Sequence, residues 1–115
     1  MKTKIIFIFL FFLLLYSACS TQLLTLTQSD ADRGAAKFEG TTIASLNEGK
    51  AIFEANCDMC HRLKSPSSRS EEKWNLIVPQ MVKKVNRKIG SEEINPKKQE
   101  LLRRYLVTMS SAISK

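Results

Sequence analysis

The sequence contains few of the residues that build many catalytic and metal sites: one histidine, three cysteines and one tryptophan among 115 residues. It contains no glycine-rich phosphate loop, no internal repeat and no strand-like alternation of apolar and polar residues. These absences argue against a nucleotide-binding loop, a repeat array and a sheet. The length allows one small domain and is too short for a catalytic domain joined to a substrate domain. We therefore expect one all-α domain.

Residues 1–18 are expected to be an export signal rather than part of the folded domain. Lys2 and Lys4 give a charged start, residues 5–15 form an uninterrupted apolar run, and small residues precede position 19. Eleven apolar residues are too few for a stable transmembrane helix, which needs about 20. We therefore predict that this segment is removed during export.

Cys19 follows this signal directly. Residues 14–19 resemble a bacterial lipobox, whose cysteine becomes the lipidated first residue of the mature chain, although Tyr16 replaces the usual aliphatic residue. Cys19 is also the odd cysteine of an exported chain, which calls for a partner or a modification. We predict that Cys19 is lipidated and anchors the chain to a membrane. An ordinary cleavage site with a stray thiol is the alternative.

Residues 19–44 are expected to be a flexible, lipid-anchored linker. Thr, Gln, Ser, Asp and Gly are frequent there, and apolar periodicity is weak. A flexible coil of this length reaches about 25–30 Å. The folded domain is then predicted over residues 45–115.

The mature chain is modestly basic. Without Lys2 and Lys4 it keeps 16 basic and 11 acidic side chains, a net charge of +5. This charge suits an acidic partner protein or an anionic lipid surface, and a solvated, solubilising surface explains it equally well. No nucleic-acid partner is expected.

Three helices are predicted in the domain, each opened by a polar N-cap residue. The first starts at Ser45 or Asn47 and ends at Asn56, just before a cysteine motif. The third starts with Asn95 as N-cap and Pro96 as its first helical residue.

The second helix is predicted to start after Ser70 and to end at Gly90. Its apolar residues recur at spacings of three and four and form one stripe. The stripe consists of Trp74, Ile77, Val78, Met81, Val82 and Val85. Pro79 lies inside it, and an interior proline breaks or kinks a helix. We therefore expect a boundary or bend near Pro79.

The motif Cys57-Asp58-Met59-Cys60-His61 has the C-x-x-C-H spacing typical of covalent haem attachment. Two cysteines three residues apart match the two vinyl positions of haem, and the adjacent histidine lies under the iron as proximal ligand. A thioredoxin-like dithiol would need a βαβ setting, and a structural zinc site needs four ligands where this motif offers three. We therefore predict one covalent haem c, held by Cys57, Cys60 and His61.

Residues 46–61 resemble the N-terminal helix and haem motif of the class I, monohaem cytochromes c, and the similarity extends over about residues 45–110. The resemblance implies a bundle of about three helices wrapped around one covalent haem. It also implies a close crossing of the first and last helices, for which Gly49, Phe53 and Tyr105 match the small and aromatic residues of the family. The function it implies is electron transfer.

A carrier haem needs a second axial ligand, and a methionine thioether is the usual choice. Met1 leaves with the export signal and Met59 lies between the haem cysteines, so Met81 and Met109 remain. The segment from Trp74 to Met81 resembles small cytochromes in which a tryptophan precedes the ligand methionine by seven residues. We predict Met81 as the distal ligand, with Met109 as the alternative. Trp74 is expected either to donate to a haem propionate or to fill the core.

Residues after the motif are expected to surround the haem. The outer ring N–H of His61 needs an acceptor, and a backbone carbonyl of the Ser65-Pro66 loop is close in sequence. Arg62, Lys64 and Arg69 are expected around the exposed haem edge. A second basic cluster comprises Lys83, Lys84, Arg87 and Lys88.

Three functions use such a haem. The first is an electron carrier on the periplasmic or outer side of a bacterial membrane, which exchanges single electrons with redox partner proteins and is not itself an enzyme. A haem subunit of a larger oxidoreductase would use the same chemistry. A gas- or peroxide-binding protein would need an open sixth site, and the chain has neither a second histidine as distal acid/base nor a second C-x-x-C-H motif.

Overall fold

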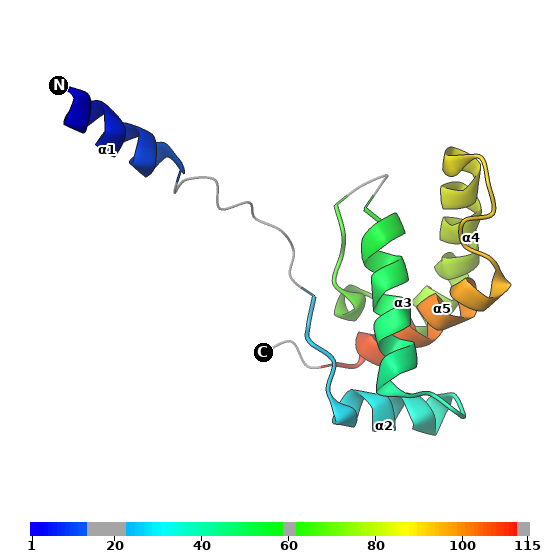
Figure 1. Ribbon diagram of the computed structural model, residues 1–115. Helices are drawn as coiled ribbons and strands as arrows, with labels where there is room; N and C mark the ends of the chain where they lie inside the picture. The colour runs from blue at the N-terminus through cyan, green and yellow to red at the C-terminus, as the bar shows by residue number, and fades with distance from the viewer. Residues whose placement is uncertain (14–22, 59–61, 113–115) are drawn as a thin grey trace.

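The computed structural model describes residues 1–13, 23–58 and 62–112, and its regular secondary structure is entirely helical (Figure 1). The elements are α1 (Lys2–Leu13), α2 (Gln28–Lys37), α3 (Ile43–Asn56), the short 3-10 helix η1 (Pro66–Ser68), α4 (Glu71–Ile89) and α5 (Pro96–Ser110). No strand occurs in the described ranges. The predicted all-α class is therefore confirmed.

α1 lies apart from the other helices (Figure 1). Its 12 residues are apolar after two lysines, and the side chains of residues 5–8 are exposed. A helix of this length measures about 18 Å, which is shorter than the apolar core of a bilayer. Among the described helices, none has the length and apolar composition that crossing a membrane requires. The export signal stays a prediction.

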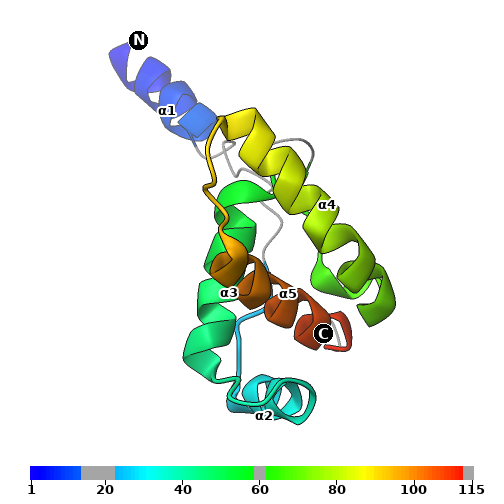
Figure 2. The same ribbon diagram turned by 90° about the vertical axis from the view of Figure 1, so that its right-hand side faces the viewer.

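α5 is the centre of the folded part, because α2, α3, α4 and η1 all pack against it (Figure 2). The largest fully buried side chains come from α3, α4 and the region of α5. They are Leu46, Phe53, Trp74, Val78, Ile94, Leu102, Tyr105, Leu106 and Val107. Full burial of one such side chain contributes roughly 1.5–3 kcal/mol. The three longest helices of the folded part therefore share one apolar core.

α3 and α5 cross at close range because Gly49 has no side chain. A Cβ at this position would overlap the carbonyl oxygen of Leu101 and lie 2.7 Å from the Cβ of Tyr105. One turn further along α3, the ring of Phe53 lies 6.0 Å from the ring of Tyr105 and 6.3 Å from the ring of Trp74. The predicted crossing of these two helices, with Gly49, Phe53 and Tyr105 at the contact, is present.

The ends of α4 and α5 follow the predicted capping residues. Ser70 Oγ accepts a hydrogen bond from the backbone N–H of Lys73, and Asn95 Oδ1 accepts one from the backbone N–H of Lys98. Gly90 closes α4 with a φ of 81°, a conformation that favours glycine.

α3 begins earlier than predicted. It starts at Ile43 with Thr42 as N-cap, and neither Ser45 nor Asn47 caps it. Thr42 Oγ1 accepts from the backbone N–H of Ser45 while Ser45 Oγ accepts from the backbone N–H of Thr42. This reciprocal pair is a capping box, here with serine in place of the usual glutamate or glutamine, and it adds one turn to the helix.

α4 runs through Pro79 without a boundary, so of the predicted boundary or bend the boundary does not occur. A proline inside a helix has no N–H for the carbonyl four residues earlier, here that of Asn75. Both Pro79 and Asn75 are exposed, so water can satisfy this carbonyl. The buried face of α4 continues on both sides of the proline and holds the helix together.

The segment predicted as a flexible linker is, in large part, folded onto the domain. Residues 28–37 form α2, which Thr27 and Asp30 open with a second capping box. Leu26, Ala31 and Thr41 are buried. The linker prediction for residues 19–44 is therefore wrong from Leu26 onward, and the folded part begins well before residue 45.

Polar contacts and cation–π contacts hold α2, which explains why the apolar pattern did not reveal it. Near its middle, Arg33 Nη2 donates to the backbone oxygen of Thr108 in α5 at 3.3 Å. At its end, the ring of Phe38 lies 4.7 Å from the guanidinium carbon of Arg103 and 5.6 Å from that of Arg104. These contacts join α2 to the C-terminal half of α5.

Candidate functional site

Cys57 closes α3 and faces the interior. It is the C-cap of the helix, its backbone N–H donates to the carbonyl of Phe53 at 3.0 Å, and 7% of its surface is exposed. Cys60 and His61 of the motif lie outside the described residues, and so does Cys19. The structure therefore gives the position of the first motif cysteine alone.

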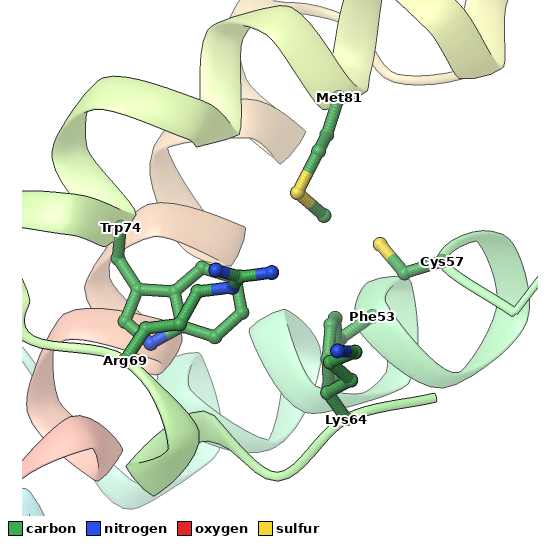
Figure 3. A pocket seen from close by; sticks show the side chains of 6 residues that line it. All are labelled: Phe53, Cys57, Lys64, Arg69, Trp74 and Met81. Carbon is green, nitrogen blue, oxygen red and sulfur yellow. The ribbon is translucent and has the colours of Figure 1, made fainter. Parts of the chain in front are cut away.

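Met81 extends from α4 into the space that Cys57 borders (Figure 3). Trp74 and Met81 lie on the same side of α4, because seven residues correspond to about two helical turns. Together these side chains form a cleft between α3, the loop around η1 and α4. Its lining residues are Phe53, Cys57, Lys64, Arg69, Trp74 and Met81. We call it the Cys57–Met81 cleft.

The Cys57–Met81 cleft is small and partly open. Its enclosed part measures about 20 Å³, which is room for one water molecule, and the space including its mouth measures about 280 Å³. Sites for cofactor-sized ligands measure roughly 300–1,000 Å³. In the described residues, α3 and α4 both pack on α5, and the edge contact between the rings of Phe53 and Trp74 links them to each other.

Trp74 is bound to the backbone of the neighbouring loop. Its indole Nε1 donates to the carbonyl oxygen of Pro66 at 2.7 Å, and the residue is 2% exposed. Because tryptophan has one N–H donor, the structure differs from the predicted propionate contact and favours the core role. The same bond occupies a carbonyl of the Ser65-Pro66 loop, in which an acceptor for His61 was predicted.

Two cations line the cleft. The half-buried Arg69 lies across the cleft from Cys57 (Figure 3), with its guanidinium carbon 5.8 Å from the centroid of the Trp74 ring. The exposed Lys64 lines the same cleft. Arg62, predicted at the same edge, is exposed and does not line it. The sequence placed all three cations near the motif but gave no sign of the stacking on Trp74.

Met109, the alternative iron ligand, lies elsewhere. It is buried, its Sδ is 3.9 Å from Nη2 of Arg33, and it lines a second pocket between the segment 24–33 and the end of α5. Since Met109 does not line the cleft that contains Cys57, the geometry favours Met81.

The outer face of α4 is basic, as the sequence indicated. Lys83, Lys84, Arg87 and Lys88 are all exposed, and α4 has no acidic residue after Glu72.

The interior behind the cleft is poorly solvated. Burial raises the pKa of the Tyr105 phenol above its ordinary value, and the nearby Glu54 carboxylate raises it further. Tyr105 therefore stays neutral at physiological pH. Within residues 1–13, 23–58 and 62–112, no group of three or more His, Cys, Asp or Glu side chains is placed to hold a metal ion.

Comparison with known proteins gives no relative: no protein-family model, no curated protein and no solved structure matches the chain significantly. The features of the chain that bear on its function are therefore the C-x-x-C-H motif and the geometry of the Cys57–Met81 cleft.

Proposed function

We propose that the chain is a monohaem cytochrome c that transfers single electrons. The observation that carries this proposal is the convergence of Cys57 and Met81 on one cleft (Figure 3). Cys57 is the first cysteine of a C-x-x-C-H motif, and Met81 is a methionine chosen from the sequence as iron ligand. Two helices that both pack on α5 bring these sulfur atoms to the same space.

The chemistry of the lining residues fits a c-type haem. Cys57 and Cys60 would hold it through thioether bonds, and His61 and Met81 would bind the iron. When bound, the haem supplies an iron that alternates between ferric and ferrous states. The rings of Phe53 and Trp74 give the cleft the apolar walls that a macrocycle requires.

The residues of the chain set the conditions for electron transfer. As an iron ligand, the uncharged thioether of Met81 would favour the ferrous state and raise the reduction potential. The neutral Tyr105 and the apolar rings exclude water from behind the cleft, and this low polarity acts in the same direction. The α3–α5 crossing at Gly49 fixes one side of the site, so the geometry changes little between oxidation states.

The proposal includes the cellular setting. Export by residues 1–18 and lipidation at Cys19 would anchor the protein on the outer side of a bacterial membrane. The basic outer face of α4 suits an acidic redox partner protein.

The test is a pair of absorption spectra, oxidised and reduced, of the full chain exported together with the haem-attachment machinery. The wild type should carry one covalent haem and give a low-spin, six-coordinate ferric spectrum with a methionine-to-iron band. Met81→Ala should lose that band and become high-spin. Met109→Ala is the matched control and should keep it.

Other outcomes would contradict the proposal. A chain without covalent haem would overturn it entirely. A high-spin wild type that binds carbon monoxide readily would indicate a gas- or peroxide-binding protein. Isolation of the wild type in a stable complex from membrane extracts would instead indicate a haem subunit of a larger oxidoreductase.

A further inference from the structure

We propose that Arg69, assisted by Lys64, binds the propionate carboxylates of the haem and so fixes which edge of the macrocycle faces η1. This inference rests on the proposed haem function and assigns a role to two side chains of the same cleft. It also replaces the predicted contact of Trp74, whose N–H is already bound to Pro66.

Arg69 is a half-buried cation that would be stabilised by a bound anion. The three other half-buried arginines, Arg33, Arg103 and Arg104, each bind a carboxylate at 2.7–2.9 Å. Arg69 is equally half-buried, yet in the described part of the chain no carboxylate forms an ion pair with it or with Lys64. A partly desolvated guanidinium is stabilised by a paired carboxylate. A ligand with carboxylates would supply it.

Trp74 holds Arg69 in position for this role. The hydrogen bond from Trp74 to Pro66 fixes the indole, and the guanidinium of Arg69 lies over its face. A cation–π contact of this kind does not use the N–H donors of arginine, and their fork geometry matches a carboxylate. Trp74 is therefore a positioning residue and Arg69 the binding residue.

The arrangement of thiol and guanidinium groups in the cleft agrees with the arrangement of vinyl and propionate groups on a haem. Cys57 and Arg69 lie on opposite sides of the cleft, with Met81 between them on α4 (Figure 3). In a c-type haem the propionates are on a different edge from the vinyl-derived carbons that bind cysteine. With one thioether at Cys57, the propionate edge can therefore point toward Arg69.

The test measures the midpoint reduction potential of the haem-loaded chain against pH, for the wild type and for Arg69→Gln, Arg69→Lys and Lys64→Gln. A neighbouring guanidinium lowers the pKa of a carboxylate, so the wild-type propionates should be ionised throughout the neutral range and the potential should be flat there. Without Arg69 the propionate pKa should rise by about one pH unit or more. Deprotonation then falls in the measured range, and because the new negative charge favours ferric iron, the potential should decrease as pH rises.

The variants are expected to shift the profile of potential against pH by different amounts. Lys64→Gln should shift the profile less, because Lys64 is exposed, and Arg69→Lys should fall between wild type and Arg69→Gln. The matched control is Lys84→Gln, which removes one exposed positive charge from α4 outside the cleft lining and should leave the profile flat. Infrared titration of the propionate carboxylates gives the same pKa values directly.

Trp74→Phe keeps an aromatic face but loses the bond to Pro66, and it should raise the propionate pKa by less than Arg69→Gln. An unchanged pKa in this variant would remove the positioning role of Trp74.

The outcomes separate this inference from the proposed function. If the wild type carries a six-coordinate covalent haem but the titrations of Arg69→Gln and Lys64→Gln coincide with the wild type, the carboxylate assignment fails and the electron-transfer proposal stands. If the wild type attaches no haem, both fail. If Arg69→Gln does not accumulate, Arg69→Lys and Lys64→Gln still decide the question, because Arg69→Lys keeps a positive charge at the half-buried position and Lys64 is exposed.

Discussion

At Gly49, the backbones of α3 and α5 approach so closely that a methyl group has no room. Gly49→Ala would gain about 1 kcal/mol of helix propensity, while the overlap with the Leu101 carbonyl would cost about 3 kcal/mol because backbone must move. We therefore expect the free energy of unfolding to decrease by about 2 kcal/mol. Urea denaturation measures it.

The adjacent exposed residue provides the control for this prediction. Glu48→Ala changes the same turn of α3 without touching α5 and should alter the free energy of unfolding by less than about 0.5 kcal/mol. A Gly49→Ala variant as stable as the wild type would mean that the two helices can separate at no cost.

Individual residues of the site differ in how far the sequence revealed them. Cys57 and Met81 were recoverable, because a fixed motif and a spacing of two helical turns determine where their sulfur atoms can lie. The partner of the Trp74 indole was not recoverable, since it depends on how the loop around Pro66 folds back onto α4. The stacking of Arg69 on Trp74 depends on the same loop.

Among the helices of the folded part, α2 is the one that the sequence did not predict. Apolar periodicity reveals helices that bury an apolar stripe, and it located α4, while polar N-cap residues indicated α3 and α5. α2 buries Asp30 and Gly34 beside Ala31 and is held through Arg33 and Phe38, so its pattern resembles that of a linker. Polar attachment between helices leaves no periodic signal in a sequence.

This attachment of α2 can be tested at Phe38. Phe38→Ala removes two cation–π contacts, each contributing about 0.5–1 kcal/mol at a partly exposed site. The free energy of unfolding should decrease by about 1–2 kcal/mol, and amides of α2 should exchange hydrogen faster than those of α5. Phe38→Leu, which keeps the apolar bulk but not the ring, should recover part of the loss. Unchanged exchange in α2 would show that other contacts hold it.

For the molecule as a whole, acid sensitivity follows from the carboxylate that joins the arginines of α5. The hydrogen bond from Arg103, with that from Arg104, lowers the pKa of Glu100 from 4.5 to about 2 despite partial burial. A lowered pKa in the folded state contributes stability that is fully present above pH 4.5 and disappears as the pH falls toward 2. Glu100 therefore stabilises the fold at neutral pH.

Glu100→Gln should reduce the free energy of unfolding at pH 7 by about 1 kcal/mol, because solvent screening limits the strength of this half-exposed group. The difference from the wild type should vanish near pH 2. Urea denaturation at pH 7, 4 and 2.5 tests this, with Glu93→Gln in the exposed pair with Lys98 as control. A difference that persists at low pH would attribute the effect to packing rather than charge.

The docking of α2 also shortens the flexible segment between the proposed lipid anchor and the folded domain. For a chain anchored at Cys19 as proposed, Leu26 is already buried seven residues further on. A coil of that length spans about 15 Å, whereas a free linker to residue 44 would span about 25–30 Å. The volume that the haem domain can search would shrink about sixfold, since volume grows with the cube of reach. The domain would then meet only partners embedded immediately beside its own anchor, at a correspondingly higher local concentration.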